Sequence, residues 1–293
     1  MQTQSASHRR GVVLAASGML AVSLDSLGIR LADASSWDIA FWFGTFTFVA
    51  MLALIPALTK KPLWRIVKDD GAPTVFSGLL QAASTTFFIV AINSTTVSNT
   101  VVIVAAAPVV AAVLARYFIG ERSTGRVWLA ILTSIIGILI VVSGSLGEGR
   151  IEGDVAAVTA ILAFSGNLTL WRRYPSINRM AAVGLGGLAM AVVAVSPADP
   201  LGLGLQAMLI LAVLGGIVGP AGRIAIASAT RYLSTAQVSL FTPVETVAAT
   251  TWAWLFLGES PPATTVVGGI LVLAAVAYGV SQRPVPLVSS ADA

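Results

Sequence analysis

Ten apolar stretches of about 18–24 residues, separated by short loops that hold nearly all of the charges, dominate this sequence. A helix of about 20 apolar residues crosses the ~30 Å hydrocarbon core of a bilayer. Of the 293 residues, 56% are hydrophobic and 10% are charged, whereas soluble domains carry about 25% charged residues. Too few polar residues remain to cover a water-exposed domain. The pattern predicts an all-α, polytopic membrane protein with ten transmembrane helices.

The distribution of Lys and Arg over the loops predicts the orientation of the chain. The expected spans are residues 11–32, 38–58, 72–92, 97–118, 126–145, 154–171, 180–197, 206–229, 235–257 and 263–281. With the amino terminus in the cytoplasm, all but three of the 17 Lys and Arg residues fall in cytoplasmic loops, the exceptions being Arg30, Arg150 and Arg223. Short loops rich in Lys and Arg stay cytoplasmic. We therefore expect an inner-membrane-type protein with both termini in the cytoplasm.

The start of the chain superficially resembles a signal peptide, with Arg9 and Arg10 before an apolar run that ends at Ala32-Asp33-Ala34. The run is too long for the apolar part of a signal peptide, and Asp25 and Arg30 interrupt its end. We expect this segment to be retained as the first span.

The missing residue types exclude several chemistries. The chain has no Cys, and its single His, His8, precedes the first span. Disulfides, thiolate metal sites and intramembrane His chemistry are therefore excluded. The net charge of +4 comes from scattered membrane-facing loops, which is not a nucleic-acid signal. We expect no metal, no cofactor and no nucleic-acid partner, and take the lipid bilayer and a small-molecule substrate as the partners.

The sequence also repeats itself weakly. The matched segments are Leu20–Asp25 with Leu162–Asn167, Arg30 with Arg172, Pro108 with Pro243, and Gly120-Glu121 with Gly258-Glu259. If the repeated unit has an odd number of spans, its second copy begins on the opposite side of the membrane from the first, so the two copies have inverted topology. Such inverted repeats are typical of secondary transporters, whose substrate site lies near the midplane between the copies. We expect two inverted five-helix repeats, residues 1–149 and 150–293, around a central cavity.

The order of these motifs resembles the EamA-type, ten-helix drug/metabolite transporter superfamily over nearly the whole chain. The residues that carry the resemblance are Pro108, Gly120-Glu121, Gly153-Asp154, Pro243, Gly258-Glu259 and Gly268-Gly269. Phe241-Thr242-Pro243-Val244 further resembles the bacterial aromatic-amino-acid exporters of that superfamily. Pro243 departs from the pattern, since it lies three residues further from its Gly-Glu than Pro108 does.

The resemblance implies a bacterial cytoplasmic-membrane exporter of amino acids, aromatic ones favoured, or of related small metabolites, working by alternating access. Export of other metabolites or cationic drugs is the alternative. A membrane-embedded enzyme is disfavoured because the spans hold no Lys and no active-site motif. A channel would need rings of like charge or filter carbonyls, and neither is evident; a non-transporting scaffold is the remaining alternative of another class.

Glu245 is the most informative polar residue in the expected spans. It lies about ten residues into the ninth span, hence ~15 Å deep, where a carboxylate costs at least ~2.5–3.5 kcal/mol. The functional interpretation is a site for a substrate amine or a proton in a central cavity. The structural alternative is an ion pair with Arg223. Arg223 itself either faces the cavity, suiting a substrate carboxylate, or extends to the interface.

Asp25 and Asn167 occupy equivalent positions in the two repeats. Each is expected to line the cavity or to form hydrogen bonds between helices, and Asp25 has Arg30 as an alternative partner. A zwitterionic substrate would need one anionic partner and one cationic or amide partner. Glu245 with Arg223, or Asp25 with Asn167, would supply them.

Several further side chains are candidates for the cavity wall. Ser84 and Thr85 belong to a polar patch in the third span, which either faces the cavity or bonds within and between helices. Trp42 and Phe241 are candidates for binding an aromatic substrate, with lipid or interface contact as the alternative.

Prolines mark the expected interruptions of the spans. Pro108, Pro243 and Gly219-Pro220 are candidate hinges for alternating access, or else static kinks.

The sequence leaves the energy source of transport open. Glu245 and Asp25 are the acids expected deep in the membrane, and they are compatible with proton antiport as well as with facilitated efflux. The sequence sets no oligomeric state, and a monomer is compatible with all of these features.

Overall fold

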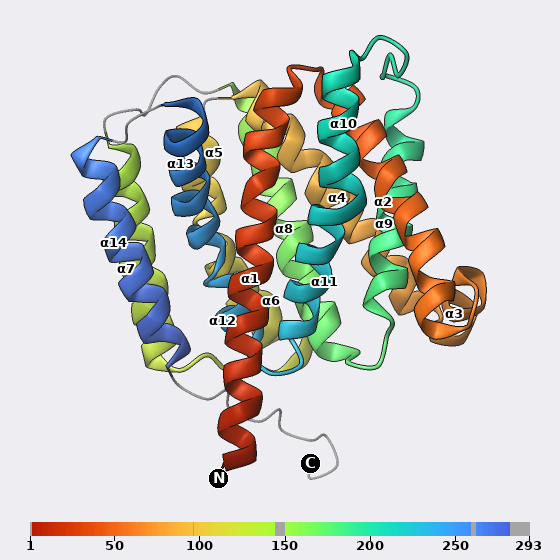
Figure 1. The fold of residues 1–293 in the computed structure, drawn as a ribbon. Helices are drawn as coiled ribbons and strands as arrows, with labels where there is room; N and C mark the ends of the chain where they lie inside the picture. Colours follow the sequence, from red (N-terminus) through yellow and green to blue (C-terminus); the bar gives the residue numbers. More distant parts are fainter. Residues whose placement is uncertain (1, 96, 144–149, 259–261, 282–293) are drawn as a thin grey trace.

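The computed structural model describes residues 2–95, 97–143, 150–258 and 262–281, and every regular element in these ranges is a helix (Figure 1). The helices are α1 (Gln2–Ala32), α2 (Ser36–Thr59), α3 (Leu63–Asp70), α4 (Ala72–Ser94), α5 (Val97–Val104), α6 (Ala107–Ile119), α7 (Gly125–Val142), α8 (Ile151–Arg173), α9 (Arg179–Ala194), α10 (Leu205–Val213), the π-helix η1 (Leu214–Val218), α11 (Gly219–Ala229), α12 (Thr235–Ser239), α13 (Thr242–Leu257) and α14 (Ala263–Val280). The expected all-α, polytopic fold class is confirmed.

Eight helical segments of the described chain are long and apolar enough to cross a membrane. They are Ala6–Ala32, Ser36–Thr59, Ala72–Ser94, Val102–Ile119, Gly125–Val142, Ile151–Arg173, Leu205–Ala229 and Ala263–Val280. Of the other two expected spans, 180–197 forms α9, and 235–257 is divided into the short helix α12 and α13; α9 and α13 have 16 residues each. A helix of 16 residues is only ~24 Å long, so the expected count of ten spans is not established.

Two of the expected spans are interrupted at proline. Pro108 lies in the first turn of α6, directly after the break from α5, and Pro243 lies in the first turn of α13, directly after α12. Proline fits there because the first turn of a helix has no acceptor for its backbone N–H. The prolines therefore break equivalent helices at equivalent places, and hinge motion at these breaks stays a prediction.

The third proline is accommodated differently. Pro220 begins α11 directly after η1, so that α10, η1 and α11 form one continuous helical segment. In a π-helix, the carbonyl of Gly215 would accept from the backbone N–H of residue 220, five positions later. That residue is Pro220, which has no backbone N–H. The Thr47 hydroxyl on α2 donates to that oxygen instead, at 2.7 Å. Local π-helical turns commonly lie at functional sites.

The most extensive helix contacts are made between the two halves rather than within each half. In Figure 1, α7 packs against α14 at one edge of the bundle and α2 against α9 towards the other, while α1 contacts α11 much as α4 contacts α8. Glycines permit the closest approaches: a Cβ added at Gly44 of α2 would lie 2.6 Å from the Gly187 carbonyl of α9. This exchange of partners fits a duplicated repeat. The expected boundary between residues 1–149 and 150–293 falls beside 144–149, outside the described residues, and stays a prediction.

Candidate functional site

A cavity lies in the centre of the bundle, between α1, α4, α8, α11 and α13. The space between its walls, with the open solvent at its mouth included, is about 670 Å³. One part of the wall is polar and consists of Asp25, Gln81, Ser84, Thr85, Arg223, Thr242 and Glu245. The remainder is apolar and consists of Met19, Val22, Phe88, Val104, Ala107, Ala160, Ile161, Phe164, Trp171 and Ile226. Both halves of the chain contribute to each part.

The polar part is organised by an ion pair between the halves. Arg223 Nη2 on α11 donates to Asp25 Oδ2 on α1 at 3.0 Å, and both side chains are almost fully buried. The guanidinium also lies over the ring of Phe43, 4.9 Å from its centroid. Arg223 therefore points into the protein and pairs with Asp25. The expected extension to the interface is wrong, because a helical side chain leans towards the N-terminal turn, which here is the direction of the cavity. The expected ion pair with Glu245 is also wrong, because the partner of Arg223 is Asp25.

This ion pair leaves hydrogen-bonding capacity unused. Asp25 Oδ1 and Arg223 Nη1 are buried and have no hydrogen-bond partner. Beside Asp25, the guanidinium has one further hydrogen bond among the described residues: Thr85 Oγ1 accepts from Arg223 Nη2 at 3.4 Å. Buried unsatisfied polar atoms are rare in native proteins and call for an explanation, of which a functional role is one.

Glu245 lines the same cavity from the first turn of α13. The break at Phe241 creates this helix start, and the positive end of a helix dipole favours a carboxylate. The Glu245 side chain is half-buried, and its carboxylate makes no hydrogen bond or ion pair with any other described residue. The cavity thus combines two carboxylates and one guanidinium.

The polar residues of α4 are divided between the cavity and a helix interface. Ser84 and Thr85 line the cavity, as does Gln81, which donates to Thr85 Oγ1 at 3.1 Å. Asn167 does not line it: buried between α8 and α4, it accepts from Ser77 Oγ at 2.7 Å and donates to Gln81 Oε1 at 3.4 Å. Of its two expected roles, the structure shows the hydrogen bond between helices.

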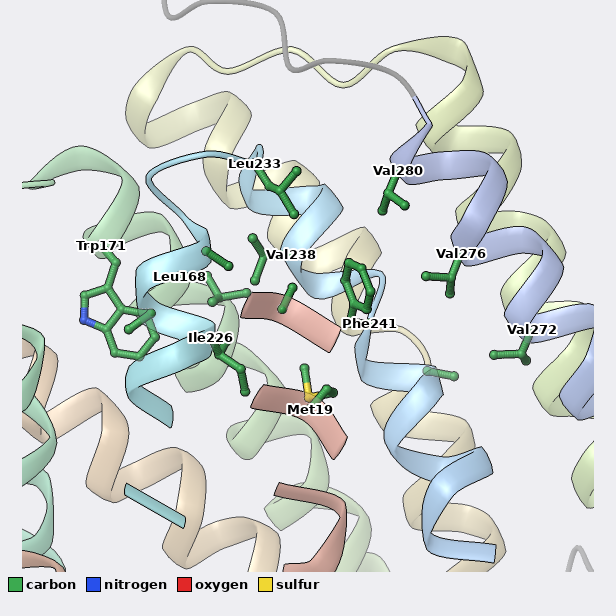
Figure 2. Packing of buried hydrophobic residues seen from close by; sticks show 14 of the residues in the cluster. Met19, Leu168, Trp171, Ile226, Leu233, Val238, Phe241, Val272, Val276 and Val280 are labelled. Atoms are coloured by element: carbon green, nitrogen blue, oxygen red, sulfur yellow. The ribbon is translucent and has the colours of Figure 1, made fainter. Parts of the chain in front are cut away.

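The two aromatic candidates lie elsewhere. Phe241 is buried in a hydrophobic cluster with Met19 and Val276 and does not line the cavity (Figure 2). Trp42 donates from Nε1 to the Pro200 carbonyl at 2.9 Å and stacks on Phe46. The expectation that these two rings line the cavity is therefore wrong, because Phe241 packs against other hydrophobic residues and Trp42 contacts the segment between α9 and α10.

Three other rings line the cavity instead. Phe88, Phe164 and Trp171 line its apolar part, and Trp171 is 2% exposed although it lies near the end of α8. Phe164 and Trp171 are seven residues apart on α8, and Phe88 is three residues after Thr85 on α4. Residues three or seven positions apart lie on the same face of a helix, so this spacing was the signal in the sequence that could have identified these rings.

The proline breaks border the cavity. Ala107 and Thr242, the residues before Pro108 and Pro243, both line it. Gly219, the residue before Pro220, lies against Arg223: a Cβ added there would be 2.7 Å from Nη1. All three candidate hinges are thus beside the cavity.

A second buried ion pair joins the halves at the lower end of the bundle, where α1 begins and α14 ends in Figure 1. Arg172 Nε donates to Glu121 Oε1 at 2.9 Å and Arg172 Nη1 donates to the Thr230 carbonyl at 3.1 Å. Glu121 Oε2 accepts from the backbone N–H of Thr235 at 2.9 Å. Both residues belong to the repeat motifs, yet their pairing was not expected. The equivalent acid, Glu259, lies outside the described residues.

Metal binding finds no support in the described part of the chain, where no group of three or more His, Asp or Glu side chains is close enough to hold an ion.

Comparison with known proteins identifies the family. Residues 9–143 and residues 152–280 each match the EamA-like transporter family. A solved structure described only as "Crystal structure of protein" covers 93% of this chain and 96% of its own, with a TM-score of 0.73 and 15% sequence identity, which shows a shared fold. None of the curated proteins compared with the chain matches it. With both halves matched, the chain belongs to the EamA-like transporter family, whose members are membrane transporters of small molecules.

Proposed function

We propose that the protein exports small amine-bearing solutes across a bacterial cytoplasmic membrane by alternating access. The observation that carries this proposal is the central cavity, which places two carboxylates beside an aromatic wall between the halves of the chain. Amino acids, aromatic ones favoured, and related small metabolites are the substrate class that the resemblance implies. A monomer is compatible with this proposal, since both halves of one chain line the cavity.

The chemistry of the wall supports an amine with an apolar body. Glu245 offers an unpaired carboxylate to an ammonium group, and Phe88 and Trp171 offer apolar surface to the rest of the solute. The pairing of Arg223 with Asp25 removes the cation that was expected to bind a substrate carboxylate. This observation favours a second candidate class, other amine-containing metabolites and cationic drugs.

Alternating access would use the interrupted helices. Pro108 and Pro243 break equivalent helices directly beside the cavity, so small rotations there would open one end of it or the other. The repeats that rock against each other are proposed to be residues 1–149 and 150–293. Protons are a candidate coupling ion, because a carboxylate that binds an amine in one state can bind a proton in the other.

The orientation is proposed from the charged loops. Those that contain Lys60, Lys61, Arg122 and Arg231 lie at the end of the bundle where α1 begins, which predicts that this end is cytoplasmic. A reporter fused after Arg283, which lies outside the described residues, should therefore be active in the cytoplasm. Activity on the periplasmic side would contradict this orientation.

Efflux from proteoliposomes tests the function. The purified protein is reconstituted, the vesicles are loaded with radiolabelled amino acids or aromatic amines, and release is followed with and without a proton gradient. Saturable release that unlabelled solute inhibits, and that protein-free vesicles lack, is expected. The response to the gradient separates proton antiport from facilitated efflux. Release no faster than from protein-free vesicles for every solute would contradict the proposal.

A further inference from the structure

The charges on the cavity wall do not balance. Among the described residues, those with a charge that line the cavity are Asp25, Glu245 and Arg223, and their formal charges sum to −1 when all three are ionised. A buried charge without a partner is costly. An occupant that carries one positive charge would bring this wall to neutrality, whereas a zwitterion would leave the sum unchanged and an anion would make it more negative.

The guanidinium is not available to a ligand carboxylate. Arg223 is held by Asp25 at 3.0 Å on one side and by the ring of Phe43 at 4.9 Å to its centroid on another. Its unpartnered Nη1 is fully buried and lies against Gly219, so a ligand in the cavity does not reach it. Binding a carboxylate there would require that Asp25 be displaced. Removing one partner from a buried ion pair is strongly unfavourable.

Glu245, in contrast, is open to a ligand. Its side chain is half-buried on the cavity wall and makes no hydrogen bond or ion pair with any other described residue. Across the cavity, Phe88, Phe164 and Trp171 offer aromatic surface, which attracts cations as well as apolar groups. The two features suit an ammonium group attached to an apolar or aromatic body.

We propose that the cavity selects singly charged organic cations over zwitterions and anions of the same shape, with Glu245 as the residue that binds the ammonium group. This inference rests on the proposed function, since it names which of the amine-bearing solutes the transport site accepts. Amino acids would bind weakly because their carboxylate meets two acids and an occupied arginine.

Three ligands that share one phenylethyl skeleton test the selectivity of the wild-type protein. They are phenethylamine (a cation), phenylalanine (a zwitterion) and 3-phenylpropanoate (an anion), titrated calorimetrically at one pH into the full-length protein in detergent. We expect phenethylamine to bind about tenfold or more tightly than the other two, the size of effect that one added charge pair brings. Equal or tighter binding of phenylalanine, or no binding of phenethylamine, would overturn the inference.

A series of charge variants assigns the preference to its residues. Glu245→Gln should lower phenethylamine affinity about tenfold, whereas Glu152→Gln, which removes the same charge from an exposed site on α8, should leave it unchanged. Asp25→Asn frees Arg223 and should shift the preference towards phenylalanine. The double variant should prefer 3-phenylpropanoate. Monodisperse elution in size-exclusion chromatography shows that each variant is folded, and an unchanged ligand order across folded variants would overturn the assignment.

The same ligands separate this inference from the proposed function. Selective binding of phenethylamine without flux in proteoliposomes would contradict transport and leave the selectivity standing. Saturable flux of phenylalanine in preference to phenethylamine would support transport and overturn the selectivity.

Discussion

In the described part of the chain, two buried ion pairs join the halves of the protein, and they differ in how completely their polar atoms are satisfied. At the lower end of the bundle, both carboxylate oxygens of Glu121 and two nitrogens of Arg172 have partners at 2.9–3.1 Å. In the cavity, Asp25 and Arg223 share one contact at 3.0 Å and each keeps a buried atom without a partner. The first network is closed, whereas the second borders empty space and a third charge, Glu245.

The difference separates a structural contact from a binding site. A closed network has no capacity left for a ligand, so its loss is expected to lower stability. An open network keeps a free carboxylate facing the cavity, so its loss is expected to change what is bound and moved. The same pair of residue types therefore has different roles according to whether its remaining atoms are satisfied.

The largest effect is expected for transport after Glu245→Gln. This substitution removes the carboxylate that binds the ammonium group but keeps the size of the side chain, so efflux should fall to the level of protein-free vesicles while membrane insertion is retained. The measurement is efflux from proteoliposomes, with Glu152→Gln as the matched control. Wild-type efflux from the Glu245→Gln protein would remove this residue from the mechanism.

The largest effect on stability is expected for Arg172→Leu. It leaves Glu121 buried without its cation, which costs about 3–5 kcal/mol for a buried pair. Thermal unfolding in detergent should show a large fall in Tm. Asp25→Asn should lower Tm less, because the asparagine side chain keeps an oxygen that can accept from Arg223 Nη2. Equal losses in the two variants would remove the distinction between the pairs.

An intermediate effect is expected for Arg172→Lys. Lysine keeps the charge but does not reproduce the fork that contacts Glu121 and the Thr230 carbonyl together. The loss of one hydrogen bond should cost about 1 kcal/mol, seen as a small fall in Tm, with the KM for efflux unchanged. A changed KM would show that the lower-end pair acts on the substrate site.

The smallest effect is expected for Thr85→Val. The Thr85 hydroxyl accepts from Arg223 Nη2 at a long 3.4 Å and from Gln81 Nε2 at 3.1 Å. Both contacts lie within the cavity wall, so their loss should change substrate binding by no more than about 0.5 kcal/mol, roughly a twofold change in KM. Efflux kinetics measure it. A loss of efflux as large as that of Glu245→Gln would show that the hydroxyl contacts the substrate directly.

Much of the fold was predictable because hydropathy reports where a helix is stable in lipid. Eight of the ten expected spans correspond to helices of sufficient length and apolar composition. The breaks at Pro108 and Pro243 followed from the missing N–H of proline. The π-helix before Pro220 was not predicted, since it depends on a hydroxyl that Thr47 supplies from another helix.

The site was predictable in its residues but not in its pairing. Counting residues estimates depth along a helix axis, and this identified Glu245 and Asp25 as deep and placed Arg223 inside a span, nearer its cytoplasmic end. It does not give the direction in which each helix turns its side chains towards its neighbours. For this reason the partner of Arg223 was missed, and Phe241 was assigned to the cavity although it packs in the adjacent cluster shown in Figure 2.

The central claim, that the cavity opens to each side of the membrane in turn, is tested most directly at Ser84. The chain contains no Cys, so a Ser84→Cys variant carries a single thiol on the cavity wall. Membrane-impermeant thiol reagents are applied to vesicles of either orientation, with and without phenethylamine or phenylalanine. Labelling from both sides, slowed by the solute that is transported, is the predicted result. Labelling from one side only, under every condition, would contradict alternating access through this cavity.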